Sequence, residues 1–128
     1  MRQNGGGLVG HWRALMDRFG NLLILANALA LMLASWTPGS YMVRSGILSG
    51  HMEHTVAYAL SGALIYAVRV GRCAAWQVAA MVSAYAGVLE LGQILVPGRH
   101  SGIDDFLFSA AGATAGVLAS ATLLKRGE

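Results

Sequence analysis

Residues 90–105 read ELGQILVPGRHSGIDD, and this stretch joins two of the most apolar runs in the chain. Pro97 and Gly98 lie near its middle, where proline cannot continue a helix and Pro-Gly favours a tight turn. The stretch therefore predicts two antiparallel helices joined by a short link. Polar and charged side chains gather around that link, among them Glu90, Gln93, Arg99, His100, Asp104 and Asp105.

The composition is that of a membrane protein. Of the 128 residues, 55% are hydrophobic and 12% are charged, whereas soluble domains carry about 25% charged residues. The net charge is +3, but the basic residues are scattered and form no stripe with interleaved aromatics, so we expect no nucleic-acid partner. Cys73 is the single cysteine, which excludes an intramolecular disulfide. We expect one all-α domain in a lipid bilayer.

Four apolar segments each have about the length that a helix needs to cross a hydrocarbon core of roughly 30 Å. We predict transmembrane helices at about residues 19–36, 52–68, 74–96 and 105–124. They form a bundle with short connections over residues 21–124, followed by a cytoplasmic tail at 125–128. The first segment also fits a signal peptide. We favour a retained helix, because the bulky Trp36 makes SWTPG a poor cleavage site.

Residues 1–20 show a different, amphipathic pattern. Apolar residues recur there at helical spacing, and the charged residues lie largely elsewhere around the helix. The apolar positions are Leu8, Trp12, Leu15, Met16 and Phe19. This pattern is typical of a helix that lies in the membrane interface with its apolar face in the lipid. We therefore predict an interfacial amphipathic helix ahead of the first transmembrane helix.

The positions of the basic residues predict the orientation. Seven of the nine Lys and Arg residues lie in the N-terminal region, in the link between the second and third segments, or at the C-terminus. Arg44 and Arg99 belong to the opposite side. Because cytoplasmic loops carry an excess of Lys and Arg, we expect both termini in the cytoplasm. The polar cluster then lies at the outer face.

Glu90 is the polar residue whose presence in an apolar segment is hardest to explain without a specific role. On a helix that ends near Val96 it would lie about 9 Å below the helix end. A carboxylate near the bilayer centre costs about 2.5–3.5 kcal/mol unless it is paired or protonated. We expect one of three partners for it: Arg99, His54 or Gln93. Glu90 and Gln93 share a helix face, as do His54 and Tyr58, because residues three or four apart are neighbours.

Several other residues have a structural explanation. Ser101 and Asp104 resemble a helix-capping box, and Asp105, about 100° further round the helix, is the candidate site residue. Gly112 and Gly116 form a G-x-x-x-G pattern, which lets two helices approach closely. We expect it to pack helices within the chain, and homodimerisation through such small-residue faces is the alternative.

A metal site is a further alternative for the polar residues. The H-x-x-H pair His51 and His54, together with Glu90 and Asp105, supplies suitable ligand types. Their spacing matches no recognised metal motif. We therefore expect neither a metal nor another cofactor.

The order of these residues resembles the VanZ-like family, small bacterial membrane proteins named for a teicoplanin-resistance protein. The family pattern has a His followed four residues later by Tyr and eight later by Gly, then Glu-x-x-Gln, Pro-Gly-Arg and an Asp six after the Arg. The matching residues are His54, Tyr58, Gly62, Glu90, Gln93, Pro97, Gly98, Arg99, Asp105, Gly112 and Gly116. The resemblance covers Gly50 to about Leu118. The chain departs from the pattern at Gly50 and His51, and it has Ser109 where the family usually has Asn.

The resemblance implies a multi-pass protein of the cytoplasmic (inner) membrane that acts in cell-envelope physiology or in teicoplanin-type glycopeptide resistance, with no settled reaction. Three functions stay open. The first is binding of an anionic lipid or cell-wall precursor head group through Arg99, Gln93, Tyr58 and Ser109. The second is a membrane-embedded hydrolase or transferase on a lipid-linked phosphate or ester, with Glu90, His54 and Asp105 as catalytic residues. The third is transport of an ion or small solute.

Overall fold

The computed structural model describes residues 5–41 and 46–126, and within these ranges the chain is helical without a strand. It contains four α-helices and one short 3-10 helix, η1. Their bounds are α1 Gly5–Trp36, η1 Gly39–Tyr41, α2 Gly50–Arg69, α3 Ala75–Gln93 and α4 Ile103–Arg126. The prediction of an all-α protein is confirmed.

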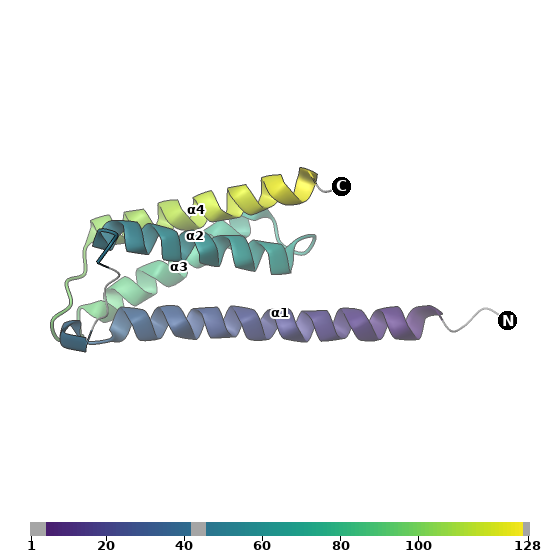
Figure 1. Ribbon diagram of the computed structural model, residues 1–128, viewed down its shortest axis with the longest axis horizontal. Coiled ribbons are helices and arrows are strands. Elements are labelled where there is room, and N and C mark those ends of the chain that lie inside the picture. The colour runs from purple at the N-terminus through teal and green to yellow at the C-terminus, as the bar shows by residue number, and fades with distance from the viewer. Residues whose placement is uncertain (1–4, 42–45, 127–128) are drawn as a thin grey trace.

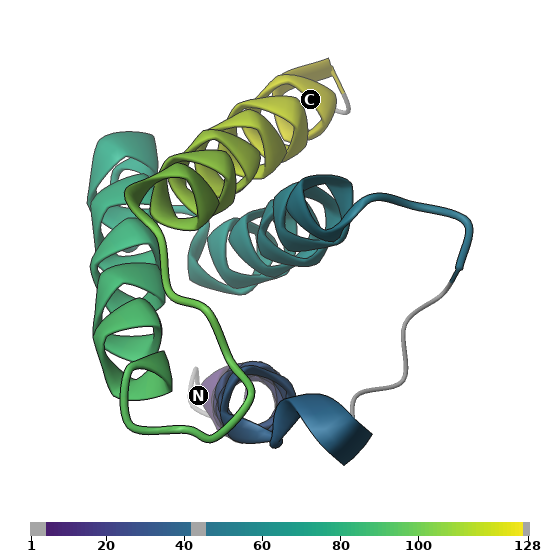
Figure 2. The ribbon, with the colours of Figure 1, turned by 90° about the vertical axis from the view of Figure 1, so that its left-hand side faces the viewer.

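Successive helices run in opposite directions, so that α2 and α4 are parallel to each other (Figure 1). The start of α1 and the end of α4 lie at the same end of the molecule. The opposite end, which we call the loop end, holds η1, the start of α2 and residues 94–102. Figure 2 views the loop end directly, and there the link from α3 to α4 passes over the end of α1.

Glycines bring α2 and α4 into close contact. A Cβ atom added to Gly112 would clash with the carbonyl oxygen of Thr55, and one added to Gly116 would clash with that of Ala59. Gly62 on α2 lies in the same way against the carbonyl oxygen of Ala113. Only residues without a side chain allow the two backbones to approach this far. The G-x-x-x-G pattern thus lies at an interface within the chain.

The core between α2, α3 and α4 is small and contains polar as well as apolar groups. A cluster of buried apolar residues within it comprises Tyr58, Val78, Val82, Ala86, Ala113 and Val117. Helix α1 is joined to this core by hydrogen bonds. Asn27 donates to Ser61 at 3.0 Å, and the Tyr85 hydroxyl donates to the Ala28 carbonyl at 2.6 Å. These bonds hold α1 beside the bundle although few of its side chains are buried.

By length and composition, two helices in the described part of the chain can cross a membrane, where the sequence had predicted four. They are Ala14–Trp36 in α1 and Ile103–Lys125 in α4. In the first, 6% of the apolar stretch is buried within the protein, and in the second 33%. Helices α2 and α3 carry too many polar residues to meet the same test: His51, Glu53, His54, Gln77 and Glu90.

The helix ends also differ from the sequence predictions. The amphipathic segment within residues 1–20 does not form a separate helix, because α1 runs unbroken from Gly5 to Trp36. Its positions 8 and 12 have side chains outside the described residues, and Arg44 lies outside them altogether. At the other terminus α4 continues to Arg126, so the start of the expected tail is helical.

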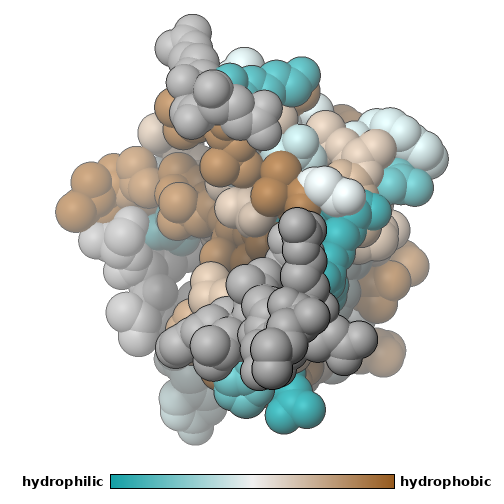
Figure 3. All heavy atoms as spheres, turned by 90° about the vertical axis from the view of Figure 1, so that its right-hand side faces the viewer, coloured by the Kyte–Doolittle hydropathy of each residue, from teal (hydrophilic) through white to brown (hydrophobic). Residues whose placement is uncertain are grey.

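The end of the molecule opposite the loop end has polar links between elements. Arg72 donates to Asp17 at 2.7 Å, and Arg69 donates to Asn21 at 2.6 Å. These contacts tie α1 to the end of α2 and to the link that follows it. Figure 3 views this end, where hydrophilic side chains lie beside strongly apolar ones.

Candidate functional site

A cavity of about 350 Å³ lies at the loop end, between α1, α2 and the end of α3. This volume is at the lower end of the range for small-molecule sites, about 300–1,000 Å³. Its wall combines apolar, aromatic, neutral polar and charged side chains. The lining residues are Leu31, Ala34, Ser35, Thr37, Tyr41, Glu53, His54, Ala57, Tyr58, Gln93 and Arg99.

Gln93, the last residue of α3, is 2% exposed and lines this cavity. Its Nε2 atom has no hydrogen-bond partner in the described part of the chain. A buried donor without a partner costs about 1–3 kcal/mol. The amide is therefore suited to donate to an oxygen atom of a molecule bound in the cavity.

Arg99 contacts the end of α1. Its Nε donates to the carbonyl oxygen of Thr37 at 3.0 Å, and its Nη2 donates to that of Ala34. The last carbonyls of a helix lack partners within the helix, and a cation there is favoured by the helix dipole. Of the three partners considered for Glu90, Arg99 is therefore not the one found, since its guanidinium group caps α1, whereas His54 does lie beside Glu90. Arg99 still forms part of the cavity wall.

Glu90 is 5% exposed and lies behind the cavity. Its Oε1 lies 3.8 Å from Nδ1 of His54, and its Oε2 accepts a hydrogen bond from the Ser101 hydroxyl at 3.3 Å. Its depth differs from the sequence expectation, because α3 ends at Gln93 and tighter turns follow up to Val96. Glu90 thus lies in the last turn of its helix.

His54 connects Glu90 to the cavity. Its Nδ1 lies 3.3 Å from the hydroxyl of Ser109, which is fully buried on α4, and near Glu90 as described above. The same imidazole lines the cavity. A carboxylate beside one nitrogen fixes the orientation of the ring. His54 can therefore present an imidazole of fixed orientation to a molecule bound in the cavity.

The start of α4 differs from the expected capping box. Helix α4 begins at Ile103, and the Phe106 amide donates to the Gly102 carbonyl at 3.2 Å, which makes Gly102 the capping position. Ser101 lies one residue too early to cap, and its hydroxyl binds Glu90 instead. Asp104 and Asp105 both lie in the first turn, where the helix dipole favours carboxylates.

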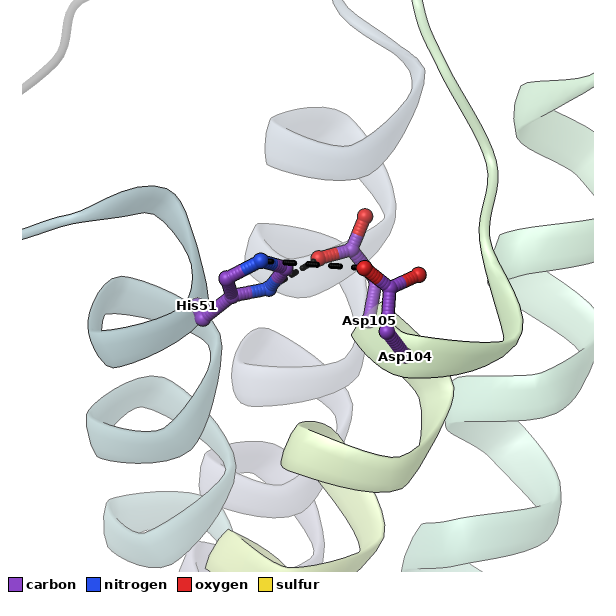
Figure 4. Close-up of side chains that lie close together, drawn as sticks. All are labelled: His51, Asp104 and Asp105. Carbon is purple, nitrogen blue, oxygen red and sulfur yellow. Dashed lines mark hydrogen bonds and ion pairs between the residues drawn. The ribbon is translucent and has the colours of Figure 1, made fainter.

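Asp105 pairs with His51 rather than with the groups around Glu90 (Figure 4). Nδ1 of His51 lies 2.9 Å from Oδ1 of Asp105, and its Nε2 lies 3.7 Å from Oδ2 of Asp104. Phe108 stacks on the imidazole with ring centroids 4.7 Å apart. The cluster joins the first turns of α2 and α4.

This cluster of His51, Asp104 and Asp105 has the donor types for a metal, with one ligand atom from each residue within 4.8 Å of the others. Both nitrogens of the imidazole face a carboxylate, however, and a metal ion would take only one of them. An imidazole bridging two carboxylates accounts for the geometry without a metal.

Some residues at this end were not among the predicted binding or catalytic residues. Glu53, next to His54, lines the cavity, and His51, which the sequence offered only as a possible metal ligand, pairs with Asp105. The contribution of α1 to this end of the molecule could not be predicted from the sequence, because it consists mainly of backbone carbonyls and of side chains such as Ser35. Tyr58, which is 3% exposed, interacts through its hydroxyl with Ser35.

Comparison of the chain with models of known families, with curated proteins and with solved structures found no match. The resemblance to the VanZ-like family therefore stays a prediction that rests on the motif residues. The functional argument depends on the site itself.

Proposed function

We propose that the protein is a VanZ-like, multi-pass protein of the cytoplasmic membrane whose cavity binds an anionic lipid or cell-wall precursor head group. In this proposal all four α-helices cross the membrane, both termini are cytoplasmic, and the loop end faces outward. The protein then acts in cell-envelope physiology or in teicoplanin-type glycopeptide resistance.

Exposed apolar side chains support the membrane location. Large apolar residues are exposed on every α-helix, including Leu22 (62%), Leu60 (67%), Leu91 (68%) and Leu123 (68%). The buried positions, in contrast, include Glu90, Gln93 and Ser109. Apolar groups outside and polar groups inside are the distribution expected where lipid, not water, surrounds a bundle.

The unpartnered amide of Gln93 is the observation that carries the binding proposal. Gln93, whose Nε2 is buried without a hydrogen-bond partner in the described part of the chain, lines the same cavity as Arg99. A phosphate or carboxylate oxygen would satisfy the Gln93 donor and would be attracted by the Arg99 charge. Membrane lipids and lipid-linked envelope precursors present such oxygens at the depth where the loop end would lie.

One observation favours the alternative of a membrane-embedded hydrolase or transferase. His54 lines the cavity while its Nδ1 lies 3.8 Å from the Glu90 carboxylate. A carboxylate that orients an imidazole is a common arrangement for a general base, which could activate water against a lipid-linked phosphate or ester. Asp105, paired with His51, lies outside this arrangement.

Binding is tested with purified protein in detergent and a short-chain phospholipid that carries a phosphate head group. We expect Gln93→Leu to weaken binding about tenfold, which corresponds to about 1.4 kcal/mol. Ser83→Ala, on the same helix and outside the cavity lining, is the matched control and should bind like the wild type. Equal affinity in the wild type and the Gln93 variant would contradict the proposal.

The orientation is tested separately by reporter fusions. A reporter joined after Lys125 should read cytoplasmic, and one inserted after Gly46 should read external. A cytoplasmic reading at Gly46 would overturn the outward-facing site, and an external reading at Lys125 would overturn the cytoplasmic C-terminus. Neither outcome bears on the ligand.

A further inference from the structure

His54 contacts the buried polar groups through one ring nitrogen. Its Nδ1 lies 3.3 Å from the Ser109 hydroxyl and 3.8 Å from the Glu90 carboxylate. We assign the ring proton to Nδ1, because an unprotonated nitrogen would turn its lone pair toward the carboxylate oxygens. In this tautomer Nε2 carries a lone pair and accepts a hydrogen bond.

The edge of the ring that holds Nε2 is the one that reaches the cavity. Ser109 is fully buried and Glu90 is 5% exposed, whereas the His54 side chain is 22% exposed and lines the cavity. Because Nδ1 faces the two buried residues, the open part of the ring lies on its other side. Neither of these contacts uses Nε2. The cavity wall therefore contains an uncharged acceptor on α2.

The amide of Gln93 and the imidazole of His54 ask for different groups on a ligand. The buried Nε2 of Gln93, which has no partner within residues 5–41 and 46–126, is a donor. The oxygens of a phosphate diester are acceptors, so they suit the Gln93 amide but not Nε2 of His54. A ligand that satisfies both residues has to bring a donor as well as a phosphate.

The surroundings favour a hydroxyl over an ammonium group as that donor. An ammonium group carries a full charge, and burying a charge is costly unless it is paired. The Glu90 carboxylate already accepts from Ser101, and Glu53 already interacts within the chain. Ser35 and Tyr58 line the cavity with neutral hydroxyl groups. A hydroxyl donor needs one acceptor and no opposite charge.

We infer that the cavity takes a head group that carries a hydroxyl beside its phosphate, a polyol phosphate ester, and that the hydroxyl donates to Nε2 of His54. This inference rests on the proposed function, because it names the class of head group that the same cavity binds. His54 determines the specificity, while the Gln93 amide serves any phosphate ester. The apolar part of the wall, formed by Leu31, Ala34 and Ala57, favours a head group attached to acyl chains over the free ester.

The test compares two phospholipids with the same short acyl chains and the same charge, one with a phosphoglycerol and one with a phosphopropanol head group. The second has the same carbon chain without the two hydroxyls, so any contact that depends on ligand charge is equal in both. Binding is measured on the purified protein in a detergent without hydroxyl groups. We expect the phosphoglycerol lipid to bind about tenfold more tightly, which corresponds to about 1.4 kcal/mol.

Two variants locate the preference. His54→Phe keeps a ring at the cavity wall but removes the acceptor, so it should bind both lipids alike, with the affinity that the wild type has for the phosphopropanol lipid. His100→Phe makes the same replacement at an exposed position outside the cavity lining. It is the matched control and should keep the wild-type ratio. The comparison of the two lipids on the wild type needs no variant, so it decides the inference even where His54→Phe does not fold.

The outcomes separate this inference from the proposed function. If the wild type binds both lipids equally and Gln93→Leu weakens both, the hydroxyl contact is wrong and the head-group site stands. If neither lipid binds, both proposals fall. If a folded His54→Phe variant keeps the wild-type ratio, or loses affinity for both lipids by the same factor, His54 does not accept from the hydroxyl and the inference is overturned. Free glycerophosphoglycerol, which has the same head group without acyl chains, should bind more weakly than the lipid. Equal binding would support the hydroxyl contact and contradict a lipid as the source of the head group.

Discussion

The Nε atom of Arg99 donates to the carbonyl oxygen of Thr37 at 3.0 Å, and so a residue of the α3–α4 link caps the end of α1. A second bond supports this junction, since the Gly39 amide donates to the Pro97 carbonyl at 3.2 Å. The two bonds close the loop end around the cavity. Arg99 thus has a positional role that is separate from any contact with a ligand.

We predict that Arg99→Met lowers the free energy of unfolding by about 1–3 kcal/mol, because it leaves the carbonyls of Ala34 and Thr37 without their charged donor. Arg99→Lys should recover part of the loss, since an ammonium group can reach one carbonyl but lacks the fork of donors. Thermal unfolding of the purified protein measures both. His100→Ala, at the exposed neighbouring position, is the control, and an equal loss in that variant would argue against the cap.

The contact between α2 and α4 gives a second prediction. Gly116→Val should destabilise the protein by about 1–3 kcal/mol or more, because the new side chain would overlap the carbonyl oxygen of Ala59 and force the helices apart. Membrane abundance and thermal unfolding both report this loss. Ala115→Val adds similar bulk at an exposed position of the same helix. If the two variants behaved alike, close packing at Gly116 would not matter for stability.

The helices could be predicted well from the sequence, because apolar length and the Pro-Gly turn determine where helices form and where the chain reverses. The surroundings of the helices could not be predicted in the same way. Glu90 and His54 lower the mean hydropathy of their helices, which counts against a membrane span, whereas in the folded chain the two side chains interact with each other. Two of four helices therefore meet the test for a membrane span, although apolar side chains are exposed on all four.

The residues of the candidate site could be predicted in part. His54, Glu90, Gln93 and Arg99 do come together at one end of the bundle. Among the three partners considered for Glu90, the structure has His54 beside it. Arg99 instead binds carbonyl oxygens of α1, which leave no mark in the sequence. The position of Glu90 was predicted incorrectly, because α3 ends at Gln93 and not near Val96. Glu90 therefore lies in the last turn of the helix.

The two aspartates at the start of α4 should differ in their effect on stability. Asp105→Asn should be the more destabilising change, because the Asp105 carboxylate lies 2.9 Å from His51 while that of Asp104 lies at 3.7 Å and is more exposed. The expected loss is about 1 kcal/mol, the value of an ordinary hydrogen bond. Asp104→Asn removes the same charge from the same helix turn and is the control. A larger loss in the Asp104 variant would contradict the pairing.

Substitution of Glu90 distinguishes the two functions that the site allows. Glu90→Gln keeps a group that can accept from Ser101 and removes the charge beside His54. If the cavity only binds a head group, this variant should keep the affinity for phospholipid, because the Glu90 side chain lies behind the wall and not in it. If His54 is a general base, the same variant should lose lipid turnover while binding is kept, since the imidazole would lose the carboxylate that orients it. Glu90→Leu separates packing from chemistry. It leaves the Ser101 hydroxyl and the His54 nitrogen facing an apolar group, so it should lower thermal stability where Glu90→Gln does not. A Glu90→Gln protein with normal stability and no phospholipid binding would contradict both functions as described.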